Sequence, residues 1–486
     1  MTIKGFATMI LVDLLLPAAV ILNIYLYFYP VLYACAFPRP SASVPAPFRL
    51  LTLADPQIEG DTTLRKYDLP PNTRFSPARA GTLIRKYGKM LDLWGNDLYL
   101  SHIYHTMRRH TFPTHTTVLG DLLGSQWITD DEFWRRAKRF WRIFGGVRQV
   151  SAEEVAGGSA LGDGWGEALM LLPGNHDVGY AGDISRPRLV RYEKAFGPYN
   201  YVLAFRPPPK EDGNGNGSLT AAVAGEEPEL RIAVLNSLTL DTPIWDQSLA
   251  DETYDFLEAL QNTRRKDGGK TQATVLLTHL PLHKPERICV DGPEMKYFPP
   301  HYGGGIKSQN FVSEDVSDKL KEMIFGSPTD EEAQGGGGSE GVILTGHDHE
   351  GCQSVHFWEK EKNAWNVMTY KKWIDGRREE EKKKGEPKTV REITVRSMMG
   401  EFGGNAGLFS AWFDYDLNEW KFEYVACALG IQHVWWTVHV VNVIAVLWTS
   451  ILALWWALDF LVPVPVAKAS DEKTSDEKTS DEKKNQ

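Results

Sequence analysis

Short apolar runs that end in polar residues recur through the middle of the chain. Five of them are "FRLLTLADPQ", "TTVLGD", "ALMLLPGNHD", "ATVLLTHLPLH" and "GVILTGHDH". Runs of four to six residues rich in Val, Leu and Ile are typical of strands buried on both faces, as in sheets covered by helices. The pattern therefore predicts an α/β domain, in which functional groups gather just beyond the carboxyl ends of the strands.

The residues that close these five runs are of the kinds that bind metals or transfer protons. They are Asp55, Gln57, Asp121, Asn175, His176, Asp177, His279, His347 and His349. A single His or Asp at a strand end is commonly a turn or cap residue. Five strand ends of the same chemical kind are not explained by turns, so the sequence predicts a metal site at one sheet edge.

Two longer apolar segments lie near the ends of the chain, at residues 5–37 and 436–462. Each is long enough to cross a hydrocarbon core of roughly 30 Å. The first is too long for the apolar part of a signal peptide, and Asp13 is its one charged exception. We predict one transmembrane helix at each end; a pair of buried core helices is the alternative.

Two spans place both termini on one side of the membrane. Residues 1–4 and 463–486 then lie on the same side, which we expect to be the cytosol from the tail described next, and residues 48–430 form a domain on the other side. The tail "SDEKTSDEKTSDEKKNQ" has no apolar residue and is expected to be disordered.

The tail ends in "KKNQ", which resembles the dilysine retrieval signal of endoplasmic reticulum membrane proteins. A cytosolic coat complex would read Lys483 and Lys484, unless the match is chance in a lysine-rich tail. The middle domain would then be lumenal, which fits the glycosylation sequon at Asn216.

Composition narrows the class of protein. The chain has 486 residues, of which 42% are hydrophobic and 24% charged, and a net charge of −10 argues against nucleic-acid binding. The four cysteines are too widely spaced for a zinc ribbon. Cys289 and Cys352 could pair in an oxidising compartment, and the sequence leaves this open.

The donor set narrows the metal. Carboxylates, imidazoles and amides without thiolates exclude a structural thiolate zinc site and permit Mn, Fe or catalytic Zn. Seven candidate ligands are too many for one tetrahedral ion. They suit two divalent ions about 3.5–4 Å apart, with Asp121 as the shared carboxylate.

The motifs Asp-x-Gln, Gly-Asp, Gly-Asn-His-Asp, a lone His and Gly-His-x-His occur here in that order, within residues 50–350. Together they resemble the calcineurin-like metallophosphoesterases. The resemblance implies a two-sheet sandwich flanked by helices, with "REITVRSMMG", "LFSAWFDYDL" and "WKFEYVACA" as strands completing the second sheet. The usual first motif is Asp-x-His; the weaker ligand Gln57 favours a harder ion such as Mn over Zn or Fe.

The resemblance also assigns roles. One ion would be held by Asp55, Gln57, Asp121 and His349. The other would be held by Asp121, Asn175, His279 and His347. His176 would protonate the leaving oxygen, and Asp177 would orient or charge its imidazole.

A narrower resemblance rests on residues 115–144, on "LPGNHDVGY…RYEKAFGPYNY" and on "LNSLTLD". These are similar to membrane-bound phosphodiesterases that remove ethanolamine phosphate from a mannose of GPI-anchor glycans, including fungal relatives named for cell division and trafficking. The implied substrate is a GPI glycolipid or GPI-anchored protein, in the endoplasmic reticulum or early Golgi. The acids Glu59, Asp61 and Asp130 could meet the substrate's amine, or they could simply be solvated.

Two other functions stay open. The same site could hydrolyse another lipid-linked or soluble phosphoester, such as a phosphomonoester, a nucleotide sugar or a phospholipid headgroup. Alternatively, the chain could be a non-catalytic membrane cargo or ion-homeostasis factor with a structural metal site.

Overall fold

The computed structural model describes residues 2–69, 76–162, 164–208, 227–265, 270–326, 340–380 and 388–461. The chain divides into two compact units. Asn23–Thr437 holds both large sheets, and the second unit combines Met1–Leu22 with Val438–Gln486. The predicted sequon at Asn216 and the dilysine pair Lys483 and Lys484 lie outside the described residues.

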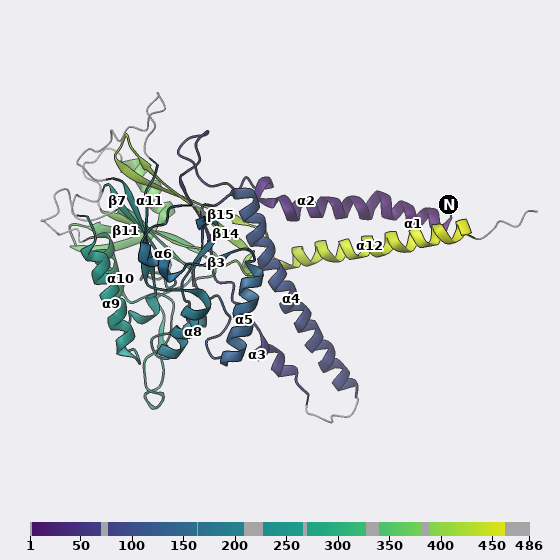
Figure 1. The fold of residues 1–486 in the computed structure, drawn as a ribbon, viewed down its shortest axis with the longest axis horizontal. Coiled ribbons are helices and arrows are strands. Elements are labelled where there is room, and N and C mark those ends of the chain that lie inside the picture. The colour runs from purple at the N-terminus through teal and green to yellow at the C-terminus, as the bar shows by residue number, and fades with distance from the viewer. Residues whose placement is uncertain are drawn as a thin grey trace, which may run out of the picture. The chain divides into compact units, whose positions relative to one another are not determined.

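The first sheet has six strands; β3, β14 and β15 are labelled in Figure 1. Their order is β15 (Glu419–Ala428), β14 (Asn405–Asp414), β1 (Phe48–Leu53), β2 (His115–Val118), β4 (Ala168–Leu171) and β3 (Arg148–Gln149). The last four run parallel, and β14 pairs antiparallel with both β1 and β15. Leu53 of β1 is in register with Val118 of β2, so the two strands end together.

The second sheet has seven strands. Their order is β12 (Ala364–Thr369), β11 (Cys352–Glu359), β13 (Thr389–Thr394), β10 (Glu340–Thr345), β7 (Gln272–Thr278), β6 (Glu229–Leu235) and β5 (Tyr201–Phe205). The four strands β13, β10, β7 and β6 run parallel, and the flanking strands are antiparallel. A separate hairpin joins β8 (Met295–Tyr297) to β9 (Ile306–Gln309).

The two sheets share one apolar core. Leu50 and Met170 of the first sheet belong to the same buried cluster as Ile232, Val275 and Leu344 of the second. Burying each such side chain contributes about 1.5–3 kcal/mol relative to leaving it in water. The sheets therefore face each other as a sandwich, and the predicted two-sheet α/β class is confirmed.

The helices from α3 to α11 belong to the same compact unit as the two sheets. The described helices are α1 (Ile3–Ile10), α2 (Leu16–Leu32), α3 (Asp61–Leu64), α4 (Pro77–Thr111), α5 (Asp130–Ile143), α6 (Ala152–Gly157), α7 (Asn175–Val178), α8 (Arg186–Phe196), α9 (Gln247–Asn262), α10 (Glu314–Phe325), α11 (Tyr370–Glu380) and α12 (Gln432–Leu461). Single 3₁₀ turns lie at Arg65–Tyr67, Trp165–Glu167, Ser237–Thr239, Pro300–Tyr302 and Gly400–Phe402.

Side chains on the helices explain their placement. Helix α4 packs on α5 and β14, while α9 and α10 pack on each other. Arg231 of β6 donates to the carbonyl of Leu260 in α9 (2.9 Å). The basic and aromatic segment at 135–144 forms most of α5, with Phe140 fully buried and Arg136 buried against Glu132 (2.8 Å). The segment is therefore an amphipathic helix whose apolar side packs into the domain.

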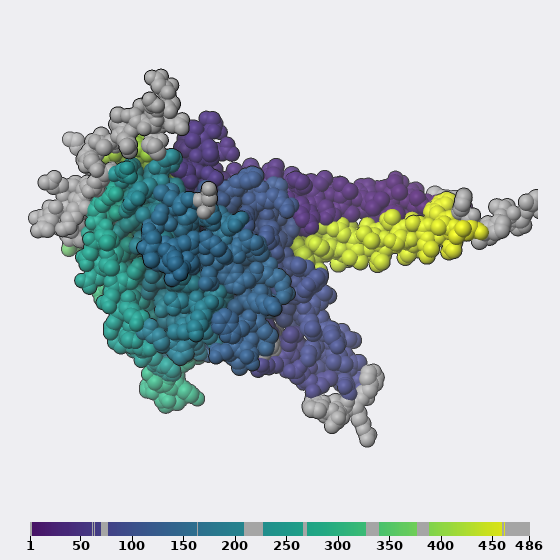
Figure 2. All heavy atoms as spheres, viewed as in Figure 1, coloured from purple at the N-terminus to yellow at the C-terminus, as the bar shows by residue number. Residues whose placement is uncertain are grey.

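The terminal helices are long and apolar. Ile3–Leu32, which includes a π-helical segment at Leu11–Leu15, and Gln432–Leu458 are long enough to span a membrane. Only 11% and 17% of their most apolar windows are buried, which disfavours the alternative of core helices. Lys4 donates to the carbonyl of Trp455 (3.3 Å), so α1 and the end of α12 lie antiparallel (Figures 1 and 2).

All four cysteines are paired. Cys289–Cys352 joins the loop after β7 to the start of β11, and Cys35–Cys427 joins the segment after α2 to β15. The first pair was left open by the sequence and the second was missed, since 392 residues separate its partners.

One assignment from the resemblance is wrong in part. Of the three late segments predicted to complete the second sheet, only β13 joins it. β14 and β15 instead extend the first sheet beside β1, with Leu50 opposite Phe409. Sequence order alone does not determine which sheet edge a late strand pairs with.

Candidate metal centre

The predicted ligands converge at the carboxyl ends of five parallel strands. Asp55 and Gln57 follow β1, Asp121 follows β2, Asn175 follows β4, His279 follows β7, and His347 and His349 follow β10. Nine described residues other than glycine have a positive φ, and four of them are candidate ligands: Asp55, Gln57, Asp121 and His347. Such backbone costs about 1–3 kcal/mol per residue and gathers at functional sites. Strain is therefore concentrated where the strands deliver these side chains.

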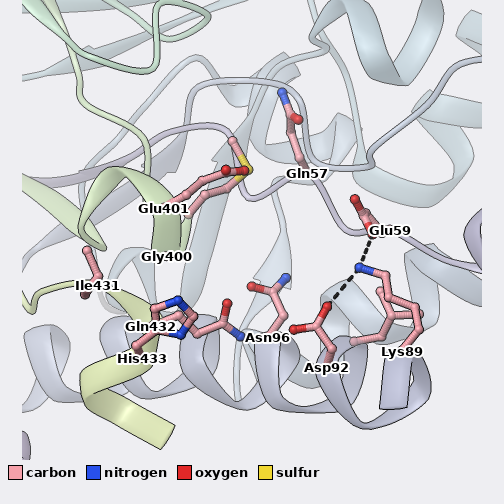
Figure 3. Close-up of a pocket in the computed structure, with 12 residues that line it drawn as sticks. Gln57, Glu59, Lys89, Asp92, Asn96, Gly400, Glu401, Ile431, Gln432 and His433 are labelled. Atoms are coloured by element: carbon pink, nitrogen blue, oxygen red, sulfur yellow. Dashed lines mark hydrogen bonds and ion pairs between the residues drawn. The ribbon is translucent and has the colours of Figure 1, made fainter. Parts of the chain in front are cut away.

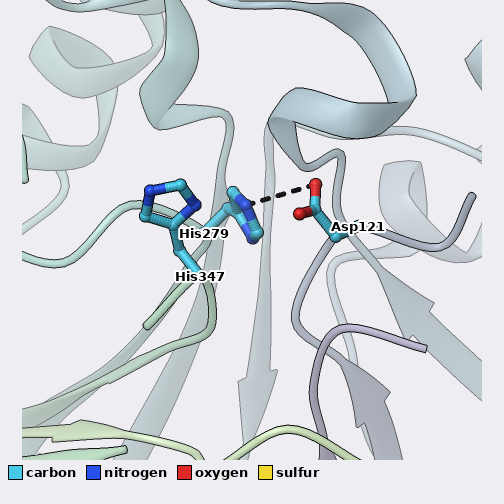
Figure 4. Close-up of side chains that lie close together, drawn as sticks. All are labelled: Asp121, His279 and His347. Atoms are coloured by element: carbon cyan, nitrogen blue, oxygen red, sulfur yellow. Dashed lines mark ion pairs between the residues drawn. The ribbon is translucent and has the colours of Figure 1, made fainter. Parts of the chain in front are cut away.

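One group of donors surrounds Asn175, and we call it the Asn175 position. It comprises Asp121, Asn175, His279 and His347. Nε2 of His279 lies 3.0 Å from Oδ1 of Asn175 and 3.4 Å from Oδ1 of Asp121. The ligating atoms of Asp121, His279 and His347 can all lie within 4.8 Å of one another (Figure 4).

Backbone carbonyls fix the two imidazoles of this position. Nδ1 of His279 lies 2.8 Å from the carbonyl of Leu119, and Nε2 of His347 lies 3.0 Å from the carbonyl of Gln309. Each of these nitrogens must carry the proton and donate, so the other nitrogen has a free lone pair. Metal-binding histidines are oriented in this way. Neither carbonyl had a signal in the sequence, because every residue type supplies one.

A second group of donors surrounds Gln57, and we call it the Gln57 position. It comprises Asp55, Gln57, Asp121 and His349. The amide nitrogen of Gln57 lies 3.0 Å from Oδ2 of Asp121 and 3.0 Å from Nε2 of His349. The backbone N–H of His347 donates to both oxygens of Asp55 (3.1 and 3.2 Å). Asp121 thus turns one oxygen to each position, as a bridging ligand would.

Buried negative charge is concentrated here. Asp55, Asp121 and Asp177 are at most 1% exposed. Burial, reinforced by the charge of Asp121, raises the pKa of Asp55 well above its usual range and that of Asp177 to about 8. Burial opposes ionisation of Asp121 as well, but the imidazoles of His279 and His176 outweigh it and lower its pKa. Clustered carboxylates of this kind are stabilised by a cation.

Burial has the opposite effect on the imidazoles. It lowers the pKa of His279 and His349, and together with the charge of His279 it lowers the pKa of His347 to about 3. These histidines are therefore neutral at neutral pH, which is the form that binds metals.

His176 and Asp177 are placed differently. The ring of His176 is 37% exposed, and its Nε2 lies 3.9 Å from Oδ2 of Asp121, beside the cluster. The carboxylate of Asp177 accepts backbone N–H groups of Leu122 (3.1 Å), Leu123 (2.8 Å) and Gly174 (2.9 Å). Among the described residues it makes no hydrogen bond to His176. Asp177 therefore holds the loops after β2 and β4, and its predicted role of orienting His176 stays a prediction.

A buried cluster of three charged or titratable side chains, Lys284, His356 and Glu392, was not predicted from the sequence. Oε1 of Glu392 accepts from Lys284 (2.8 Å) and from the backbone N–H of Leu282 (2.9 Å), and Oε2 contacts Nε2 of His356 (2.7 Å). Burial lowers the pKa of Lys284, and the same contacts hold the pKa of Glu392 at about 2 against its burial. This cluster fixes the segment that follows His279, because Glu392 bonds both the backbone N–H of Leu282 and the side chain of Lys284. The Lys in "HLPLHK" was its only visible signal.

The residues present fit a pair of divalent ions. As oriented in the structure, the lone pair of His279 faces the carbonyl oxygen of Asn175 and a carboxylate oxygen of Asp121 with no proton between them. Such facing acceptors repel one another, and a cation bound between them would relieve the repulsion. The oxygen and nitrogen donors permit Mn, Fe or Zn. The two-sheet fold and this donor set fit a metallophosphoesterase-like protein.

Comparison with curated proteins gives two relatives. Protein TED1 of Saccharomyces cerevisiae is 32% identical over 462 residues, which cover 83% of this chain and 82% of the relative. An uncharacterized protein of Schizosaccharomyces pombe is 27% identical over 403 residues, covering 80% of this chain and 75% of the relative. No protein-family profile matches the chain.

Two solved structures are distantly similar. GAP50, the anchor in the inner membrane complex of Plasmodium, has a TM-score of 0.30 and 8% identity, over 66% of this chain and 70% of that one. A 5′-nucleotidase precursor from Thermus thermophilus has a TM-score of 0.29 and 11% identity, over 82% of this chain and 58% of that one. At these scores the likeness carries no inference about function.

Proposed function

Because this chain belongs to the same family as Protein TED1 of Saccharomyces cerevisiae, we propose a function that joins its fold to its membrane helices. The chain is a metal-dependent phosphodiesterase that removes ethanolamine phosphate from a mannose of GPI-anchor glycans. It acts on GPI glycolipids or GPI-anchored proteins in the endoplasmic reticulum and so supports their maturation and export.

One observation carries the phosphodiesterase assignment. Seven oxygen and nitrogen donors converge where strand ends of the two sheets meet, with a carboxylate shared between two ion positions and an exposed imidazole beside it. Two divalent ions bound there would supply Lewis acidity toward a phosphate and would lower the pKa of water. A structural metal site has no need for a second position or for a neighbouring exposed His.

The chain's own residues would do the following. The donors Asp55, Asp121 and Asn175 are held rigidly at the strand ends, because hydrogen bonds to backbone N–H groups fix the loops that carry them. His176 stands at the solvent side, where it can give a proton to the departing mannose oxygen. Asp177 keeps His176 in place indirectly, by holding the loops on both sides of it.

The lumenal placement is part of the same proposal. Both disulfides lie within the sandwich unit and suit an oxidising compartment. Two antiparallel apolar helices suit a chain with both termini in the cytosol. Endoglycosidase should shift the protein on a gel through a glycan at Asn216, and a C-terminal tag should be reached without breaching the lumen. A tag protected until the lumen is opened would contradict this topology.

Mass spectrometry of GPI glycans from cells lacking the protein tests the substrate. We expect a retained ethanolamine phosphate on one mannose, restored to wild type by the intact chain and not by Asp121→Asn. An unchanged GPI glycan, with hydrolysis of another phosphoester by the purified protein, would assign the site to that other substrate. An unchanged glycan with no hydrolysis would favour a non-catalytic role.

A further inference from the structure

A cavity of about 460 Å³ opens beside Gln57 (Figure 3). Four separate segments form its walls: the loop after β1, the middle of α4, the turn at Met399–Glu401 and the first residues of α12. It therefore adjoins the Gln57 position on one side. On the other side it is closed by the helix that provides the second candidate membrane span. We call it the Glu401 cavity.

The charge that lines the Glu401 cavity is unbalanced. Lys89 is its one lysine or arginine, and its ammonium lies 3.0 Å from Glu59 and 2.8 Å from Asp92. The third carboxylate, Glu401, has no ion-pair partner among the described residues and reaches into the cavity (Figure 3). Three carboxylates against one ammonium leave a formal surplus of two negative charges.

The wall also carries an unused hydrogen-bond donor. Nε2 of Gln432 is buried and has no partner among the described residues. A buried amide nitrogen left unpaired costs free energy until an acceptor reaches it. The cavity thus offers a carboxylate for a cation, and the amide of Gln432 in its wall has hydrogen-bonding capacity left for an oxygen of a bound group.

We propose that the Glu401 cavity is the binding site for the aminoethyl phosphate group of the substrate. The inference rests on the proposed function and extends it to substrate recognition. Glu401 receives the primary ammonium, the phosphate lies toward Gln57 at the metal centre, and Gln432 donates to an oxygen of the attached group. Lys89 forms ion pairs with Glu59 and Asp92. Glu401 is therefore the carboxylate that selects the amine.

Binding of small phosphates tests the cavity without requiring turnover. Full-length protein in detergent, loaded with Mn²⁺, is titrated by calorimetry with O-phosphoethanolamine and with 2-hydroxyethyl phosphate, which differ only in the amine. We expect the wild type to prefer the amine, and Glu401→Gln to lower that preference about tenfold, the equivalent of one charge-assisted hydrogen bond. Lys89→Met should raise it, because it frees Glu59 and Asp92.

The matched control is Glu361→Gln, an exposed acid in the turn between β11 and β12, which should keep the wild-type preference. A wild type without preference for the amine, or a preference that survives Glu401→Gln, overturns the proposal. Circular dichroism confirms that each variant is folded.

Hydrolysis separates this inference from the proposed function. Two diesters of ethanolamine phosphate are compared, one linked to mannose and one to diacylglycerol. Amine-dependent binding with cleavage of the mannose diester supports both statements. Amine-dependent binding with cleavage of only the diacylglycerol diester keeps the cavity and rejects the GPI substrate. Cleavage of the mannose diester without amine-dependent binding keeps the function and rejects the cavity.

Discussion

The Asn175 and Gln57 positions share Asp121, but they differ in whether their polar groups already have hydrogen-bond partners. At the Asn175 position, lone pairs face each other and both imidazoles are fixed by backbone carbonyls. At the Gln57 position, the amide nitrogen of Gln57 already donates toward Asp121 and His349 at 3.0 Å. A cation would satisfy the donors of the first position as they are oriented, whereas those of the second are already satisfied by an amide.

This difference predicts unequal ions. An ion at the Gln57 position must turn the amide over so that its oxygen faces inward, which sacrifices two hydrogen bonds of about 0.5–1.5 kcal/mol each. We therefore expect a tightly held ion at the Asn175 position and a weaker, exchangeable ion at the Gln57 position. The predictions below follow in order of their expected effect on metal binding.

Loss of the shared carboxylate should empty both positions. Asp121→Asn keeps the shape of the side chain and its contact with the backbone N–H of His176, but removes the bridging charge. Elemental analysis should find neither ion, and hydrolysis should fall to background. A variant that retains one ion per chain would show that the positions do not share Asp121.

Loss of a ligand that belongs to only one position should weaken the binding of one ion and spare the other. His279→Ala should weaken the tight ion at least about a hundredfold, since even indirect partners of a metal ligand are worth 10–100-fold. His349→Ala should spare that ion and lose only the weaker one. Metal content after dialysis distinguishes them, with the exposed His301→Ala as control. Equal losses in the two variants would mean that the ions bind only as a pair.

Substitutions of Gln57 should raise or lower the affinity of the weaker ion, depending on the new side chain. Gln57→His supplies the ligand of the usual motif and should tighten the second ion about tenfold, near the low end of what one partner contributes. Gln57→Leu has no donor and should leave a single ion per chain. Calorimetric titration with Mn²⁺ measures both. No change in either variant would show that Gln57 does not face the ion.

His176 should have no effect on metal and a large effect on rate. His176→Ala should keep both ions but lose about 10²–10⁴-fold in kcat on a mannose-linked diester, whose leaving oxygen needs a proton. A nitrophenyl diester, which leaves readily, should slow much less. Loss of metal would make His176 a ligand, and equal slowing of both substrates would assign it to charge stabilisation instead.

The sequence predicted the parts of this site that depend on strand ends. Apolar runs followed by Asp, Asn or His revealed the donors from Asp55 to His349, because the strands that carry them are buried on both faces. The asymmetry between the two positions could not be predicted, since it depends on which way the amide of Gln57 points. The pairing of β14 with β1 was missed for a related reason, because pairing is decided between distant segments.

Contacts between residues far apart in the sequence could not be predicted for the same reason. Cys427 pairs with Cys35 across 392 residues of sequence, and Glu401 reaches its cavity from a turn with no motif. Asp177 lies in the most informative motif of the chain, yet its neighbours are the backbone groups of another loop. A motif identified the residue, and only the fold could show what it touches.

Titration of metal-free, full-length protein with Mn²⁺, followed by electron paramagnetic resonance, tests the unequal pair most directly. The first equivalent should give the signal of an isolated Mn²⁺ ion, and only the second, at higher concentration, should convert it to the signal of a coupled pair. In Gln57→His the coupled signal should emerge at lower Mn²⁺. A coupled signal from the first equivalent onward in the wild type, or none at saturation, would contradict two unequal ions that share Asp121.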